Sequence, residues 1–107
     1  MISLNQTSEE FFTTEVLMEA HEQGWLAFHI EKASRGGRIL THVRGDTGFA
    51  DIFATRGGRI VYAELKVKNR KPQANQEAWL AAMRLTCAEC YVWWPKDAAE
   101  IERVLKE

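Results

Sequence analysis

Hydrophobic positions recur with a helical period in some segments of this chain and with a strand period in others. Phe12, Val16 and Ala20 follow one another at the spacing of a single helix face. Runs rich in β-branched and aromatic residues predict strands instead. In chain order αβββαβα, we expect a helix at 8–22, strands at 25–30, 50–55 and 60–67, a helix at 73–86, a strand at 91–94, and a helix from Asp97.

Turn-forming residues mark where these elements end. Gly24 is expected at the C′ position of the first helix, and Asp97 is a natural N-cap of the last. Residues 31–48 are rich in Gly and Arg and are expected to form a long loop, a kind of segment that is usually functional or disordered. The second helix is expected to present one alanine-rich face, formed by Ala74, Ala78, Ala81 and Leu85.

The turn Arg-Gly-Gly-Arg at 56–59 lies between two strand-like runs and is a strong signal for a two-residue hairpin loop. Counting outward from that loop places Asp51 directly opposite Glu64. Lys66 follows two residues later, so strand alternation returns it to the same face as Glu64. The sequence therefore predicts two carboxylates and an ammonium side by side.

Directly opposed like charges destabilise a strand pair unless something cationic lies between them. A carboxylate pair with an adjacent ammonium suits a divalent cation with oxygen ligands, placed beside a reacting phosphate. A simpler interpretation stays open on the residues alone. Glu64 and Lys66 could lie on a solvated strand face, and Asp51 could be an ordinary turn residue.

Length and composition place limits on the type of protein. A chain of 107 residues is expected to form one domain, residues 1–107. It begins without a signal-peptide pattern and has no apolar run of the ~20 residues that a membrane span needs. We therefore expect a soluble cytoplasmic protein with no membrane partner. Cys87 and Cys90 have no paired histidines to complete a zinc site and are expected to be reduced thiols.

Charge is distributed unevenly, although the formal net charge is only −1. Between Lys32 and Lys71 there are ten basic and three acidic residues, so the acidic pair lies inside a basic segment. Such a segment is typical of a protein that binds a phosphate backbone, although solvated loop charges would give the same pattern. The expected DNA contacts are Arg35, Arg38, Arg44, Lys68, Arg70 and Lys71.

Several short motifs, taken in order, resemble the PD-(D/E)xK nuclease superfamily and within it the VRR-NUC family, especially its small stand-alone members typical of phages. They are Gly48-Phe49-Ala50-Asp51, Glu64-Leu65-Lys66 and Gln76, after a first helix that carries Glu15. The matching pattern extends over nearly the whole chain. The resemblance implies an α/β fold with a restriction-endonuclease-like αβββαβ core, in which helices flank a mixed sheet.

The resemblance also implies a metal site. Asp51 and Glu64 would bind Mg²⁺, for which Mn²⁺ can substitute, and the backbone carbonyl of Leu65 would be a further oxygen ligand. Glu15 would reach the site from the first helix, with Glu19 as the alternative.

In the same family pattern, Lys66 would position the attacking water or help to deprotonate it, and Gln76 would orient Lys66 or that water. The catalytic set is then Asp51, Glu64, Lys66, Gln76 and Glu15. The expected activity is metal-dependent hydrolysis of DNA phosphodiester bonds by an endonuclease. The alternative is a non-catalytic DNA-binding module with the same fold.

So small a chain has little surface for reading bases, which favours cutting of branched DNA such as four-way junctions. The resemblance implies a homodimer, in a phage protein inside a bacterial host or in the bacterial cytoplasm. Some aromatic residues could be shared across such an interface: Phe11, Phe12, Trp79, Trp93 and Trp94.

Overall fold

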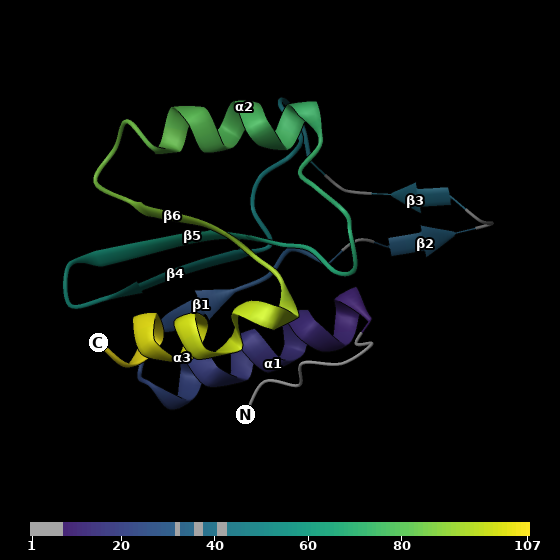
Figure 1. Cartoon of the computed structure of the whole chain (residues 1–107). Helices are drawn as coiled ribbons and strands as arrows, with labels where there is room; N and C mark the ends of the chain where they lie inside the picture. The colour runs from purple at the N-terminus through teal and green to yellow at the C-terminus, as the bar shows by residue number, and fades with distance from the viewer. Residues whose placement is uncertain (1–7, 32, 36–37, 41–42) are drawn as a thin grey trace.

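A four-stranded mixed sheet forms the centre of the molecule, with helices on both of its faces (Figure 1). The computed structural model describes residues 8–31, 33–35, 38–40 and 43–107, with side chains for 8–31 and 43–107. The elements are α1 (Glu9–Glu22), β1 (Leu26–Phe28), β2 (Ala33–Arg35), β3 (Arg38–Leu40), β4 (Ile52–Arg56), β5 (Arg59–Leu65), α2 (Ala74–Met83), β6 (Glu89–Trp93), a 3₁₀ turn (Pro95–Asp97) and α3 (Ala98–Lys106).

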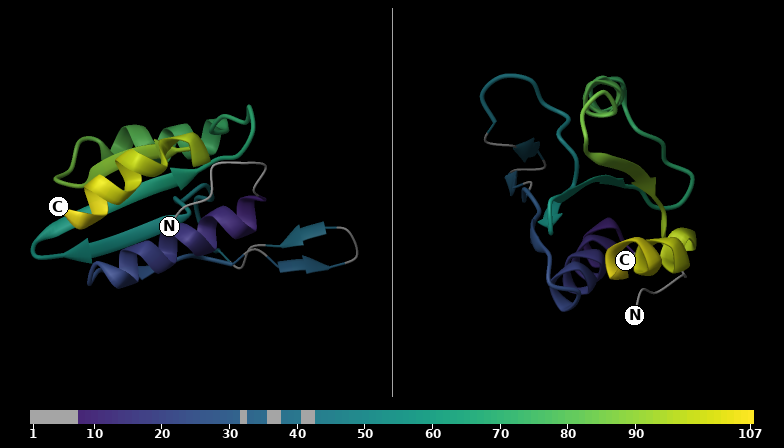
Figure 2. Two further views of the ribbon diagram at one scale, coloured as in Figure 1. Left: turned by 60° about the horizontal axis from the view of Figure 1, so that its bottom comes forward. Right: turned by 90° about the vertical axis from the view of Figure 1, so that its left-hand side faces the viewer.

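Strand order in the main sheet is β1-β4-β5-β6, with the β5–β6 pair parallel and the others antiparallel. Helices α1 and α3 cover one face and α2 covers the other (Figure 2). The α/β class and the mixed sheet flanked by helices are therefore confirmed.

The hairpin register was predicted correctly. Gly57 and Gly58 both have positive φ, 56° and 82°, as a two-residue loop between twisted strands requires. Strands β4 and β5 pair from Arg56 opposite Arg59 to Ile52 opposite Ala63. The ladder ends there, one residue before the Asp51–Glu64 position, so Asp51 lies just outside the strand in which it was predicted.

Alternation along β5 divides the interior into two clusters. Val61, Ala63 and Leu65 are buried against α1 and α3, in the cluster that also holds the predicted helix face of α1. Tyr62 belongs to the other cluster, with Leu80 of α2. By the same alternation, Glu64 points to the α2 side, where a polar group needs a partner.

The turn end of the β4–β5 hairpin is held to helix α3 through the indole ring of Trp25. The guanidinium carbons of Arg56 and Arg59 lie 4.6 Å and 4.9 Å from the ring centroid of Trp25. Trp25 Nε1 donates to the Leu105 carbonyl (2.7 Å), and Arg59 binds both oxygens of Glu89 (2.7 and 2.8 Å). Strand β6, α3 and the turn are thereby held together.

This ion pair predicts a pH-dependent stability. The hydrogen bonds from Arg59 lower the pKa of Glu89, although partial burial opposes the shift. A lowered pKa stabilises the fold above the unfolded-state value of about 4.3, and this stability is lost as pH falls through the folded value. We expect Glu89→Gln to lower Tm at pH 7 by up to about 4–8 °C, for a contribution of up to about 1 kcal/mol.

The difference in Tm between Glu89→Gln and wild type should shrink as pH falls below about 4.3 and disappear once the pH is below the lowered pKa of Glu89 in the folded protein. Differential scanning calorimetry across pH measures it, with Glu22→Gln, an exposed carboxylate at the end of α1, as the control. A difference that persisted unchanged at low pH would contradict the role of the pair.

Two expectations about the fold were wrong. The loop predicted at 31–48 contains the antiparallel β2–β3 hairpin, with Arg35 opposite Arg38, and Figure 1 shows it projecting beside the main sheet. Helix α2 was predicted to extend to residue 86 but ends at Met83, so Leu85 lies beyond it and is 90% exposed; the buried residues of the helix are Gln76 and Leu80.

The aromatic argument for a shared interface was wrong in part. Phe12 and Trp93 are fully buried within one protomer. The ring nitrogens of Trp79 and Trp94 donate to the carbonyls of Thr47 and Arg70, and among the five rings only Phe11 is strongly exposed. These rings therefore carry little argument for a dimer.

Two further observations concern the cysteines and the helices. Both thiols are free, and partial burial raises the pKa of Cys90. Within the described part of the chain, no helix is both long and apolar enough to cross a membrane.

Candidate functional site

The predicted acidic pair lies where β4 begins and β5 ends. Glu64 is 1% exposed and Asp51 is 6% exposed. Because Asp51 lies beyond the last ladder pair, its side chain takes a backbone donor: Leu65 N–H donates to Asp51 Oδ2 at 2.8 Å. That bond connects one carboxylate to the residue directly after the other.

Lys66 is also buried, and it extends the pairing of β5 with β6. Its backbone N–H donates to the Trp93 carbonyl at 2.9 Å. Its Nζ lies 3.8 Å from Glu64 Oε1, with both side chains less than a tenth exposed. The ammonium expected beside the carboxylates is therefore next to Glu64, and this environment is not a solvated strand face.

Gln76 joins helix α2 to the same carboxylate. Its Oε1 accepts the backbone N–H of Gln73, the N-cap of α2, at 2.8 Å. Its Nε2 donates to Glu64 Oε1 at 3.0 Å. The two partners fix which end of the amide faces the carboxylate. The sequence predicted that Gln76 would orient Lys66 or a water, whereas the structure gives it Glu64 as partner.

The main chain on either side of Asp51 is held by two residues that sequence reasoning missed. His29 Nδ1 lies 2.8 Å from the Asp51 carbonyl oxygen, and Ala50 N–H donates to the Tyr62 hydroxyl at 3.0 Å. Burial raises the pKa of Tyr62 to about 12, so this phenol stays protonated. Tyr62 lies two residues before Glu64 on the same strand, so strand alternation could have placed it on the same face of the sheet.

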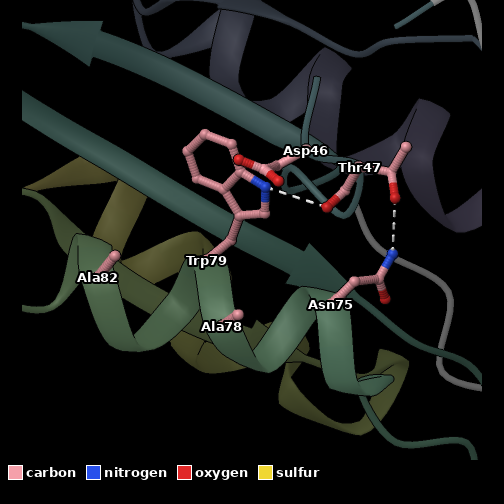
Figure 3. A pocket seen from close by; sticks show the side chains of 6 residues that line it. All are labelled: Asp46, Thr47, Asn75, Ala78, Trp79 and Ala82. Carbon is pink, nitrogen blue, oxygen red and sulfur yellow. Dashed lines mark hydrogen bonds between the residues drawn. The ribbon is translucent and has the colours of Figure 1, made fainter. Parts of the chain in front are cut away.

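The loop before Asp51 is docked on the first turns of α2 (Figure 3). Asn75 Nδ2 donates to Thr47 Oγ1 at 3.2 Å, and Trp79 Nε1 donates to the Thr47 carbonyl at 3.1 Å. These residues line a hollow of about 360 Å³. Gly48 follows with φ of +101°, and a Cβ there would lie 2.8 Å from the Asn75 backbone.

Replacing Gly48 tests this close approach. Gly48→Ala is expected to lower the free energy of unfolding by about 1–3 kcal/mol more than Gly45→Ala, because only the first adds an overpacked contact. Gly45 has nearly the same φ, +102°, but a Cβ there meets no described atom within 4 Å. Urea unfolding of both variants gives the difference, and equal losses would exclude the clash.

A cleft of about 390 Å³ opens above Asp51 and Lys66. The N-terminal turns of α1 and α2 form its walls, and His29 and Arg70 line it as well. A neighbouring hollow of about 310 Å³ shares Asp51 and Arg70 with it, as well as Gln73 and Gln76. Asp51 and Lys66 thus have access to solvent at this end of the sheet, whereas Glu64 does not line the cleft and lies behind its neighbour Lys66, at 3.8 Å.

Helix α1 contributes different residues from those predicted. In the described residues, neither Glu15 nor Glu19 lines the cleft, whereas Glu9 and Glu10 do. Glu19 instead accepts a hydrogen bond from Gln23 Nε2 at 3.0 Å. In the sequence, two acidic residues directly after the helix cap Ser8 could have indicated that the first turn of α1 lies at the cleft. Ser8 caps the helix by accepting a hydrogen bond from the Phe11 N–H.

The donor set suits a hard cation with few protein ligands. No cluster of three or more His, Cys, Asp or Glu side chains with metal-binding geometry occurs among the described residues. Mg²⁺ is commonly bound through one or two carboxylates, with waters and substrate phosphates completing the octahedron. Because a carboxylate has about four acceptor positions, Asp51 and Glu64 can keep their hydrogen bonds and still coordinate. Two carboxylates are oxygen ligands of the kind that Mg²⁺ and Mn²⁺ take in proteins.

Four of the six basic residues that were expected to contact DNA have described side chains. Arg44, Lys68 and Lys71 are exposed. Arg70 lines the cleft and has its Nη1 3.7 Å from Glu9 Oε2. The remaining two, Arg35 and Arg38, have side chains outside the described residues.

Comparison with protein-family models, with curated proteins and with solved structures finds no match to this chain.

Proposed function

We propose that this protein is a metal-dependent endonuclease that hydrolyses DNA phosphodiester bonds. The observation that supports it best is a solvent-open cleft lined by a buried lysine and a buried carboxylate, Lys66 and Asp51, with the second buried carboxylate, Glu64, 3.8 Å from the lysine. Asp51 and Lys66 are each 6% exposed and Glu64 is 1% exposed. Burying several charges is costly unless they are paired or used to bind a ligand, so this cluster is a strong candidate for function.

Each residue has a specific role in the proposed reaction. Asp51, Glu64 and the Leu65 carbonyl would hold Mg²⁺ or Mn²⁺. When bound, the metal lowers the pKa of a coordinated water and offsets charge on the phosphate. Lys66 orients the attacking water and faces the developing negative charge. Gln76 keeps the Glu64 carboxylate in one orientation through its 3.0 Å hydrogen bond.

The order Gly48, Asp51, Glu64-Leu65-Lys66 and Gln76 supports membership of the VRR-NUC family as part of the same proposal. That family suggests a restriction-endonuclease-like core, a homodimer and branched DNA as substrate, in a phage or bacterial cytoplasm. A two-fold dimer would present two sites to opposed strands of a junction. Light scattering at micromolar protein decides between that dimer and a ~12 kDa monomer.

A cleavage assay tests the activity directly. Purified protein is mixed with supercoiled plasmid and with labelled duplex, flap, splayed-arm and four-way-junction DNA, in Mg²⁺, Mn²⁺ or EDTA. We expect cutting in either metal only, fastest on a branched substrate, and a Tm that rises with metal. DNA binding without cutting in either metal would favour the non-catalytic module instead.

The basic segment carries a separate prediction. Neutralising a residue that contacts phosphate should weaken DNA binding and reduce the salt slope by about one unit. We expect this for Arg44→Ala and Lys71→Ala, and also for substitutions at Arg35, Arg38, Lys68 and Arg70. Arg103→Ala is the control, because Arg103 lies on α3 and has its Nη1 3.3 Å from Glu107 Oε1. Fluorescence anisotropy titrations at salt concentrations from roughly 50 to 300 mM give the slope of log affinity against log salt concentration. Equal slopes for all variants would place these charges away from the DNA.

A further inference from the structure

His29 occupies a position at the cleft that the proposed reaction does not yet use. It is half-buried, follows the last residue of β1 and lines the cleft together with Asp51 and Lys66. Its Nδ1 lies 2.8 Å from the carbonyl oxygen of Asp51. The ring therefore contacts the main chain of a proposed metal ligand and not its carboxylate.

The chemistry of this contact fixes the proton. A carbonyl oxygen only accepts hydrogen bonds, so Nδ1 must donate and must carry a hydrogen. Nδ1 keeps that hydrogen in the charged ring and in the neutral tautomer that the bond selects. The hydrogen bond is consequently present in either charge state of His29, with Nε2 as the other ring nitrogen.

The backbone explains why a side chain is needed here. Strands β1 and β4 pair only as far as Phe28 opposite Phe53. Continuing that register would place Ile30 opposite Asp51, yet Ile30 lies outside β1 and is 38% exposed. The His29 ring supplies the donor to the Asp51 carbonyl from the β1 side. On the other side, Leu65 N–H donates to the Asp51 carboxylate at 2.8 Å.

We propose that His29 is a positioning residue, which acts through Nδ1 to hold the Asp51 peptide so that the Asp51 carboxylate stays aligned with Leu65 and Glu64. The catalytic half of this inference rests on the proposed nuclease function. The structural half does not, because the orientation of Asp51 can be measured without DNA.

Three substitutions separate the two ring nitrogens. The side-chain nitrogen of Asn is as many bonds from Cα as Nδ1 is, and that of Gln matches Nε2. His29→Asn therefore retains the donor to Asp51, His29→Gln displaces it, and His29→Ala removes it. His21→Ala is a matched control, because His21 Nε2 lies 3.2 Å from the Ala27 carbonyl but His21 is exposed and does not line the cleft.

The first measurement is hydrogen exchange of the Leu65 amide in metal-free protein, by NMR. We expect His29→Ala and His29→Gln to speed this exchange about tenfold, and His29→Asn to restore the wild-type rate. The Lys66 amide donates to the Trp93 carbonyl in the same strand end and serves as the internal reference. Global unfolding would speed both amides alike, which would overturn a local role.

The second measurement is cleavage of the preferred DNA substrate in Mg²⁺. We expect His29→Ala and His29→Gln to lower kcat about tenfold with KM changed less than about twofold, His29→Asn to stay near wild type, and His21→Ala to be unaffected. Activity kept by Gln and lost by Asn would assign the role to Nε2 and overturn the proposal. Wild-type values in all three variants, or failure of Asn to rescue, would overturn it as well. If wild-type protein cuts no DNA, the proposed function fails, and the amide exchange alone decides on His29.

Discussion

Asp51→Asn is expected to lower the rate of DNA cleavage in Mg²⁺ by about a hundredfold to a thousandfold without unfolding the protein. In wild-type protein the Leu65 N–H donates to Asp51 Oδ2 at 2.8 Å. The asparagine side chain keeps an oxygen that can accept this hydrogen bond, so the turn retains its shape. What is lost is one of the two charges that would hold the cation. Because the change also relieves repulsion with buried Glu64, Tm of the metal-free protein should stay level or rise.

Plasmid nicking rates and calorimetry measure both parts of this prediction. Asp46→Asn is the matched control, since Asp46 is an exposed carboxylate on the loop that leads to Asp51. It should cut at the wild-type rate. Undiminished cutting by Asp51→Asn, or a loss explained only by unfolding, would contradict the assignment of the acidic pair.

The sequence was sufficient for the parts of the fold that depend on local chemistry. Two adjacent glycines and strand alternation fix the register of β4 with β5, and with it the side of the sheet that Glu64 and Lys66 share. Strands β2 and β3 were missed because both lie in the Gly- and Arg-rich stretch 31–48, whose composition is typical of a loop. The packing face of α2 was missed because alanines are found on both buried and exposed helix faces and so do not indicate which face is buried. The residues that are buried, Leu80 and Gln76, contact residues distant in sequence.

The same distinction applies to the candidate site. The helical phase of α1 could be read from Phe12, Val16 and Ala20, but its placement along the sheet could not. The first turn, with Glu9 and Glu10, therefore lines the cleft where Glu15 was expected. Contacts of this kind depend on how elements pack together, and periodicity within one element does not specify them.

Lys66→Met is expected to separate catalysis from metal binding. Methionine fills a similar buried volume but removes the ammonium, whose Nζ lies 3.8 Å from Glu64 Oε1. Because lysine is no metal ligand and its charge repels a cation, Mn²⁺ should bind with an unchanged or lower Kd. Cleavage should nevertheless slow by about a hundredfold or more, since no positive side chain then faces the attacking water and the phosphate.

Lys68→Met makes the same substitution two residues away, at an exposed side chain. Losing a charge there should raise KM through weaker phosphate attraction and leave kcat unchanged, so a fall in kcat confined to Lys66→Met isolates the chemical step. Calorimetric titration with Mn²⁺ and single-turnover cleavage measure the two quantities. If Mn²⁺ affinity fell in Lys66→Met as far as in Asp51→Asn, Lys66 would be supporting the architecture of the metal site, and the water-orienting role would have to be assigned to another group.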